Sequence, residues 1–544
     1  MALLKNGAVT APPSAPAAAR ALTSGDPFAA TGVAADRGAN RYGFCSIEDF
    51  PPGISDLSFT HEDAGGFYNY VNKFTAPNFW YRDGGVLSWI YGEEYDDWQG
   101  TYGFDACVAE YHSGHGTMDG NGVFSMPMGG TWGGSAWVNS ADMRLGNEVA
   151  RYLFFSTCLS LRIGGGNSPI RTWDAANLGL RMIFGFETTS VDNPDYGALF
   201  FTKWNANGRK FSKAWLDASW EIDPHQAPSV VACGATQAEA QDRLWNEGNF
   251  STAAASKNWW WWTWYDAAKS IREDRLELPG SPQTARFAPQ RLSPSRLTEL
   301  AGHYGVRLDG GLPDDALGPH GVALGAGPSG DGGPRLTIDH RGVREITFAE
   351  ADGTGRDAPS AAEAVRIAQD AVETFGLADR VDLVADKVRH QYHAGGTADE
   401  IADPRVRETH VVFTQLVDGH PVVTPGLGEV RVSIDGGGTV TTIVDATREV
   451  ERLAGSAPAA PSPGREDTRN PSTVDEALDA PAQRLLRRLS AGGRVPAEVR
   501  TIPDSTAVGY ALRGDDGTHV VRRTVEVDCG EGLAKRYVLE APLR

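Results

Sequence analysis

FDACVAEYHSGHGTMDG, residues 104–120, ends an apolar-leaning segment in glycines and two imidazoles. An apolar run of this length followed by small residues is typical of a buried strand that stops at a turn. His112 and His115 lie three residues apart in the loop. The pattern leaves three interpretations open: a metal site, a general acid or base, or an ordinary polar turn.

Strand-like and helix-like segments alternate on both sides of this loop, from residue 41 to about 266. Thr60 and Asp63 form an expected capping box at the start of one helix. The alternation predicts an α/β fold, with a mainly parallel sheet that helices cover on both faces. The predicted strands are 41–47, 78–84, 104–111, 151–158, 178–187 and 229–235, and the predicted helices are 60–71, 195–206, 211–222 and 237–247.

The second half of the chain has a different pattern. A helix at 360–376 precedes antiparallel hairpins at 409–423 and 428–444, and a later helix precedes another meander. The tryptophan-rich run at 258–271 is interpreted as packing that seals one domain against the next. We expect an Ala/Pro-rich tail at 1–40, an α/β domain at 41–275, a linker at 276–335, a small α+β module at 336–454, a linker at 455–470 and a second small α+β module at 471–544.

Composition excludes several classes of function. The net charge of -20 over 544 residues supplies no basic face for a nucleic acid. No apolar run approaches the roughly 20 residues of a membrane-spanning helix. The first residues lack a continuous apolar core, so we expect a cytoplasmic protein, with export by another route left open. The five cysteines are widely spaced without a CxxC pair, which predicts neither a disulfide framework nor a zinc site.

The site hypothesis rests on two loops. The apolar run after the histidine loop, YLFFSTC, ends in Cys158. Two adjacent parallel strands would bring the imidazole of His115 and this thiol to the same edge of the sheet, as nucleophilic catalysis requires. Gly114 and Gly116 would let a substrate approach the backbone. The alternatives are a core thiol at Cys158, a structural turn, and a metal pair of His112 and His115 that has no evident third ligand.

These two motifs resemble those of the caspase-like cysteine peptidases, the group of caspases, metacaspases, legumains and gingipains. YHSGHG is similar to the metacaspase pattern, which places the catalytic role on His115, and FFSTC matches the block that ends in the nucleophile, here Cys158. Residues 42–247 also resemble an uncharacterised bacterial family in which a DLSFTHEDA-like stretch precedes the GHG motif.

The resemblance implies a caspase-like fold, a Cys-His dyad and no cofactor or metal. Cys158 would attack the scissile carbonyl of a peptide or protein substrate, and His115 would protonate the leaving amine. The N–H groups of Cys158 and Gly116 would hold the oxyanion. Two departures stand out: Ser156 replaces the usual acidic residue or Gln, and no glycine follows the cysteine.

The substrate pocket has four candidate carboxylates. Each lies in a loop at the same sheet edge and would bind a basic substrate residue, if the acidic charge of the chain signals such a substrate. The alternative is that each is an ordinary solvated loop carboxylate. The candidates are Asp119, Glu187, Asp192 and Asp195.

The C-terminal half resembles the propeptide-type modules of secreted bacterial peptidases. We therefore expect residues 336–544 to cover or regulate the active-site edge. The sequence as a whole predicts a cysteine endopeptidase. A peptide ligase or cyclase of the same chemistry and a catalytically silent binding scaffold remain as alternatives, and the oligomeric state is not predicted.

Overall fold

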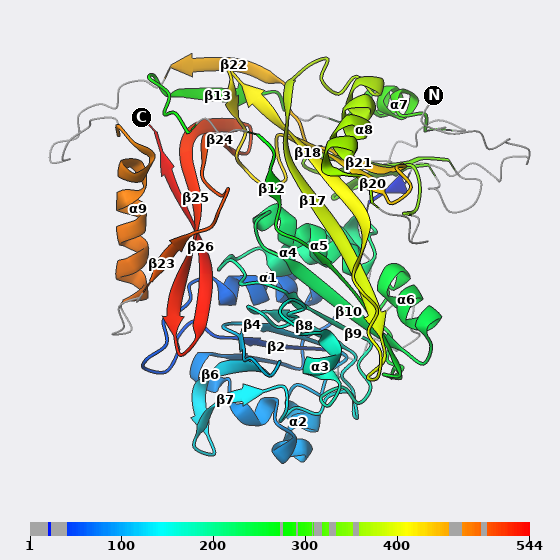
Figure 1. Cartoon of the computed structure of the whole chain (residues 1–544), viewed down its shortest axis with the longest axis vertical. Helices are drawn as coiled ribbons and strands as arrows, with labels where there is room; N and C mark the ends of the chain where they lie inside the picture. The colour runs from blue at the N-terminus through cyan, green and yellow to red at the C-terminus, as the bar shows by residue number, and fades with distance from the viewer. Residues whose placement is uncertain are drawn as a thin grey trace, which may run out of the picture.

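The computed structural model describes residues 20–22, 41–272, 276–289, 292–306, 308, 318–325, 333–351, 358–455, 471–490 and 498–543. The expected tail at 1–40 and linker at 455–470 therefore lie outside the described residues, apart from 20–22 and 455. Figure 1 shows an elongated molecule with the α/β part at one end and the C-terminal half at the other.

A parallel array of strands forms the centre of the α/β part. In spatial order these strands are β3 (Phe79–Arg82), β2 (Tyr42–Ser46), β4 (Ala109–Ser113), β8 (Tyr152–Ser156) and β9 (Met182–Phe186), each parallel to its neighbour. Every residue of the last four is buried. Strands covered on both faces need apolar residues at nearly every position, which accounts for their continuous apolar runs.

Helices and a hairpin cover the two faces of this array. Phe154 of β8 shows one face, since its ring stacks on Phe184 at a centroid distance of 4.2 Å within the core beneath the helices. Its neighbour Phe155 points into the opposite core. The first core is closed by α1 (Thr60–Val71), α4 (Tyr196–Phe201), α5 (Phe211–Ile222) and α6 (Gln237–Asn246). The second is closed by α3 (Pro169–Trp173) and the strands β5 (Thr117–Met118), β6 (Phe124–Trp132) and β7 (Ser135–Asn139). Helix α2 (Asp96–Tyr102) joins this side through Gln99, which donates to the carbonyl of Tyr91.

The expected capping box of α1 is wrong. Thr60 is the first helical residue, and the residue before it makes no side-chain cap. The buried Asp63 carboxylate instead accepts hydrogen bonds from the hydroxyls of Tyr111 (2.6 Å) and Ser113 (2.7 Å) and from the N–H of Gly197 (3.0 Å). Asp63 therefore ties α1 to β4 and α4, and its burial raises the pKa of its carboxyl to about 6.

The sheet turns antiparallel after β9. The strand β10 (Pro228–Gly234), expected among the parallel strands, runs antiparallel to β9, and its first residue pairs with Phe186 at the end of β9. The intervening helices α4 and α5 return the chain to the edge that it left, so β10 runs in the opposite direction. The resulting fold is mixed α/β with a large mixed sheet.

The tryptophan-rich run forms the strand β11 (Trp259–Tyr265), which joins the two halves of the molecule. It pairs with β10 on one side and with β17 (Asp382–Gly396) on the other. Trp260 points into one core and Trp261 into the other. Trp261 lies against Gly395 of β17, where an added Cβ would overlap its indole ring. The sheet therefore continues without a break past the expected boundary at residue 275.

The C-terminal half extends this sheet with antiparallel strands beneath α8 (Ala361–Thr374). Ser360 caps α8 by accepting the N–H of Glu363. The expected linker at 276–335 holds β13 (Gln283–Phe287), α7 (Pro294–His303) and β14. The added strands and their branches are β18 (Arg405–Val417), β20 (Glu429–Asp435), β21 (Val440–Asp445), β16 (Arg344–Thr347), β15 (Arg335–Asp339), β14 (Gly321–Leu324), β1 (Arg20–Ala21), β12 (Lys269–Ser270) and β19 (His420–Pro421).

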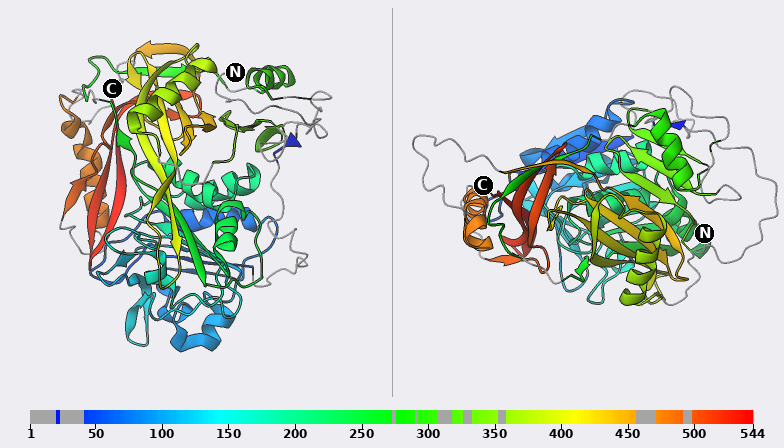
Figure 2. Two further views of the ribbon diagram at one scale, coloured as in Figure 1. Left: turned by 45° about the vertical axis from the view of Figure 1, so that its right-hand side comes forward. Right: turned by 90° about the horizontal axis from the view of Figure 1, so that it is seen from above.

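A second sheet carries the last part of the chain. Its long hairpin, β25 (Asp516–Gly530) and β26 (Leu533–Pro542), packs against α9 (Val474–Leu489). The hairpin runs along the side of the molecule to the α/β part, as both views show (Figures 1 and 2). Its other strands are β13, β22 (Val450–Gly455), β23 (Val499–Thr501) and β24 (Ala507–Arg513). Within the residues described above, no helix is long and apolar enough to cross a membrane.

The contact between Trp261 and Gly395 gives a test of the joint between the halves. Gly395→Ala is expected to lower the free energy of unfolding by about 1–3 kcal/mol, because the new Cβ overlaps the indole ring. Urea denaturation measures this loss. Gly280→Ala is the matched control, since no heavy atom lies within 4 Å of its added Cβ. Equal stability of the two variants would contradict the packing described.

Candidate functional site

His115 and Cys158 leave the sheet at the same edge. Ser113 of β4 pairs with Ser156 of β8 in the parallel register. Each proposed catalytic residue follows its paired serine by two positions, so the two loops leave adjacent strands side by side. The loops also touch, because a Cβ added to Gly116 would lie 2.7 Å from the carbonyl oxygen of Cys158.

The backbone turns sharply after the thiol. Leu159 has φ 60°, in the left-handed region that favours glycine. A non-glycine residue held there costs on the order of 1–3 kcal/mol, and such strain is concentrated at functional sites. The glycine that the resemblance leads one to expect after the cysteine is absent from the sequence, but the backbone conformation that it would serve is present.

A backbone carbonyl orients the imidazole of His115. Its Nε2 lies 2.9 Å from the oxygen of Ser55, and the ring of Phe50 lies over it at 4.8 Å between centroids. Because a carbonyl only accepts hydrogen bonds, Nε2 carries the hydrogen and Nδ1 carries the lone pair. Among the residues that the structure describes, none bonds to this Nδ1. His115 is therefore arranged to receive a proton at Nδ1.

The environment of His115 disfavours its charged form. Burial lowers the pKa of His115 to about 3; the Ser55 hydrogen bond opposes this shift, and the positive charge of Lys535 adds to it. A change from the ordinary value of 6.5 corresponds to roughly 5 kcal/mol. His115 is consequently neutral near pH 7 in this structure.

Ser190 is the immediate neighbour of the Cys158 thiol. The N–H of Ser190 donates to Sγ at 3.3 Å, and its hydroxyl oxygen lies 3.6 Å from Sγ. Cys158 is fully buried. In the described part of the chain, the N–H groups of Cys158 and Gly116 donate no hydrogen bond. Neither amide is therefore committed to another acceptor among the described residues.

The four candidate pocket carboxylates separate into two kinds. Asp192 is buried beside the site, where it accepts the N–H of Ser58 at 3.0 Å. Glu187 accepts the N–H groups of Ile163 and Gly164 and so holds the glycine-rich loop that follows the thiol.

Asp119 and Asp195 lie outside this group. Both are exposed, and Asp119 accepts the N–H groups of Asn121 and Val123 within its own turn. No contact between described residues joins either carboxylate to the dyad. Of the four candidates, Asp192 lies two positions after Ser190, whose N–H contacts the Cys158 thiol.

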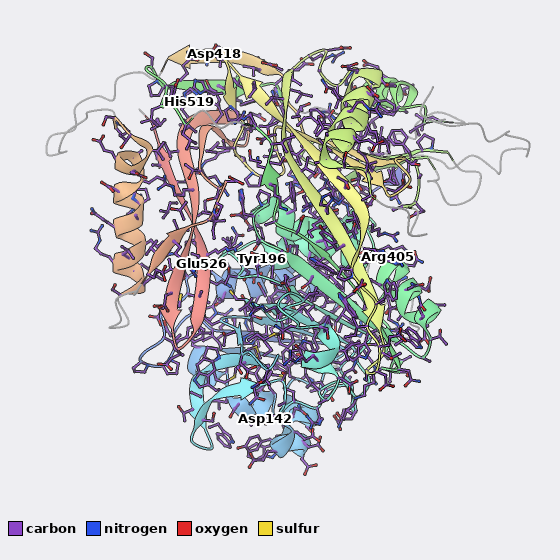
Figure 3. All side chains as sticks on the ribbon, viewed as in Figure 1. Asp142, Tyr196, Arg405, Asp418, His519 and Glu526 are labelled. Carbon is purple, nitrogen blue, oxygen red and sulfur yellow. The ribbon has the colours of Figure 1, made fainter. Side chains whose placement is uncertain are left out.

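The tip of the β25–β26 hairpin covers the site. The carbonyl of Cys529 accepts the N–H of Ser55 at 2.9 Å, and the carbonyl of Gly532 accepts the hydroxyl of Thr117 at 3.0 Å. Glu526, labelled on the β25 ribbon in Figure 3, accepts the hydroxyl of Thr189. The hairpin therefore rests on the loops that follow β2, β4 and β9.

A second hydrogen-bonded group lies at the end of β2. Ser46 Oγ is 2.8 Å from His61 Nδ1, and His61 Nε2 is 2.9 Å from Asp83. Ser46 is fully buried, and its hydroxyl oxygen also accepts the Trp80 indole N–H. Asp83 accepts the N–H of Glu48 as well. These hydrogen bonds fix the start of the loop that carries Ser55.

His112 belongs to the opposite core. Its Nδ1 lies 2.6 Å from the hydroxyl of Tyr91, and its ring packs near Phe155. Over the described ranges, no group of three or more His, Cys, Asp or Glu side chains is arranged to hold a metal ion. His112 and His115 therefore point to different surroundings although they lie three residues apart.

Sequence reasoning missed Ser55, Ser190 and Lys535. The Ser55 carbonyl and the Ser190 N–H are backbone groups that any residue type supplies, and a lone serine in the sequence gives no signal that its hydroxyl contacts Lys535. Lys535 lies more than 370 residues after Cys158 in the chain. Only the three-dimensional fold brings it to the site.

Comparisons with known proteins add little to this geometry. Residues 45–264 match the model of a family described as "Domain of unknown function (DUF6345)". No curated protein matches the chain. Among solved structures, the Arg-specific cysteine proteinase gingipain R is similar at 9% identity with a TM-score of 0.24, over 59% of this chain and 66% of that one, just under two thirds of its length. A TM-score this low does not establish a shared fold.

The buried imidazole predicts a loss of stability in acid. His115 has a pKa of about 3 when folded and about 6.5 when unfolded, so unfolding takes up a proton between these values and stability is lost as the pH falls below 6.5. Between pH 6.5 and 4.5 this loss is about 2 kcal/mol. In His115→Gln the acid loss should be smaller by this amount, while other buried histidines such as His112, whose pKa burial also lowers to about 3, keep their contribution. Urea denaturation at the two pH values measures the difference.

His340→Gln is the control for this experiment, because that side chain is exposed on a turn. It should lose as much stability on acidification as the wild type does. The same acid loss in His115→Gln as in the wild type would contradict a buried neutral imidazole.

Proposed function

We propose that the chain is a cysteine endopeptidase with Cys158 as nucleophile and His115 as general base and acid. The observation that carries this proposal is the equal offset of the two residues from the paired ends of β4 and β8. The free Nδ1 of His115 and the two unbonded amides add the proton acceptor and the oxyanion donors that the reaction needs.

The steps follow from the hydrogen bonds of the site. Cys158 Sγ transfers its proton to His115 Nδ1, while the Ser55 carbonyl stabilises the imidazolium through Nε2–H. The thiolate attacks the scissile carbonyl, and the N–H groups of Cys158 and Gly116 hold the oxyanion. His115 returns the proton to the leaving amine, which departs and leaves a thioester. Water, deprotonated by His115, releases the acid product and the thiol.

The described state has to open before this chemistry occurs. Cys158 and His115 are both fully buried, so a substrate reaches them only when the hairpin tip leaves the site. Complete burial also favours a second candidate function, a silent scaffold that keeps the fold for binding. An amine in place of water would give ligation, since every step up to the thioester is shared.

A peptide library incubated with the full chain separates the first two candidates. Wild type is expected to cleave slowly because the site is covered, and Cys158→Ala is expected to abolish cleavage. His115→Ala should lower the rate by roughly 10²- to 10⁴-fold, the usual contribution of a general base. Mass spectrometry of the products measures the rates and shows whether an added amine is incorporated.

Cys233→Ala is the matched control, since it removes an equally buried thiol from β10. It should cleave like the wild type. Cleavage that survives Cys158→Ala would refute the assigned nucleophile. If neither the wild type nor Lys535→Glu, which is expected to uncover the site, cleaves any peptide, the scaffold is favoured.

A further inference from the structure

The segment Ser190–Asp192 presents a strand edge beside the thiol. One side of this segment is held by the protein: the N–H of Val191 donates to Gln226 at 3.2 Å, and its carbonyl accepts the hydroxyl of Tyr196 at 3.2 Å. Such a segment leaves its other backbone groups pointing away, where an extended peptide can add a strand. In this structure that place is taken.

The strand β26 occupies the edge. The N–H of Arg536 donates to the carbonyl of Ser190 at 3.1 Å, and the N–H of Asp192 donates to the carbonyl of Arg536 at 2.9 Å. These bonds make a parallel bridge between Val191 and Arg536. An extended substrate that used the same backbone groups would have to displace β26.

The side chain of Lys535 enters the site next to this bridge. It is 2% exposed, and its Nζ donates to the hydroxyl of Ser190 at 3.0 Å. The N–H of the same serine contacts Cys158 Sγ. One residue therefore joins the ammonium to the thiol. The space that the buried Lys535 side chain fills, here called the lysine pocket, begins next to Cys158.

The pocket also holds a negative charge. Asp192 is 6% exposed; burial raises the pKa of its carboxyl, and the charge of Lys535 opposes that rise. Lysine is almost never fully buried in proteins unless it is paired. The hydroxyl of Ser190 and the carboxylate of Asp192 supply a polar end for an ammonium at the bottom of a buried pocket.

We infer that this pocket recognises a lysine side chain of the substrate and that Lys535 of the hairpin is its internal occupant. The substrate class is then peptides with lysine next to the attacked carbonyl. This inference rests on the proposed function. It makes Ser190 and Asp192 specificity-determining residues and the β25–β26 hairpin a competitor for the substrate.

The first experiment tests occupancy without relying on catalysis. Lys535→Glu in the full chain places a carboxylate beside Asp192 and is expected to drive the hairpin out. Alkylation of Cys158 by iodoacetamide, followed by mass spectrometry, should become roughly 10- to 100-fold faster. Arg513→Glu is the matched control: it makes the same charge change at an exposed side chain of β24 and should alkylate like the wild type.

A milder variant provides the same test if Lys535→Glu does not fold. Lys535→Gln keeps most of the side-chain length without the charge, and thermal melting reports whether each variant is folded. Folded variants of both kinds that alkylate at the wild-type rate would overturn the occupancy of the pocket by Lys535.

The second experiment tests specificity in the uncovered Lys535→Glu chain. Two peptides differ only in lysine or norleucine before the cleaved bond, so that the second has the stem without the ammonium. Lysine is expected to raise kcat/KM by roughly 10- to 100-fold, and Asp192→Asn should remove most of this preference.

The two experiments fail in different ways. Faster alkylation without any cleavage would refute the peptidase and keep the hairpin as an occupant. Cleavage without a preference for lysine would keep the peptidase and overturn the lysine pocket.

Discussion

The parallel pairing of β4 with β8 is the constraint on which the site depends. Side chains alternate between the faces of a strand, so a shift of one residue would move every side chain to the other face. The observed register keeps Tyr111 and Ser113 on Asp63 and sends His112 into the opposite core. It also brings the loops of His115 and Cys158 out together. Core packing and the placement of the His115 and Cys158 loops are thus set by the same hydrogen-bond ladder.

The sequence predicts elements better than it predicts their long-range partners. Helix α1 spans the predicted residues 60–71, but its apparent capping residue Asp63 is used by β4 and α4, because tertiary hydrogen bonds outcompete a local cap. The predicted strand 104–111 begins later, at Ala109, because the Asp105 carboxylate accepts the N–H groups of Gly146 and Ala150 and holds its own segment as a loop. Apolar periodicity contains no information about either contact.

The site illustrates the same limit. The motifs identify the residues proposed to change bonds, since thiols and imidazoles are recognisable by type. The groups that orient them are a carbonyl at Ser55 and an amide at Ser190, which no residue type reveals. The cover comes from another sheet, and its contacts are again mostly carbonyls, at Cys529 and Gly532. Function at this edge is therefore specified by backbone placement, which requires the whole fold.

The order of these parts along the chain has a consequence for biosynthesis. Roughly 270 residues separate the end of β11 from the start of β26, and at typical rates of synthesis this distance takes on the order of half a minute. During the first part of that interval β17 is still to be made, and throughout it the β25–β26 hairpin is incomplete, although the loops of His115 and Cys158 have already left the ribosome. Each nascent copy passes through a period with an open thiol loop and an unpaired tryptophan edge. A cover encoded before the loops of His115 and Cys158 would have avoided that period.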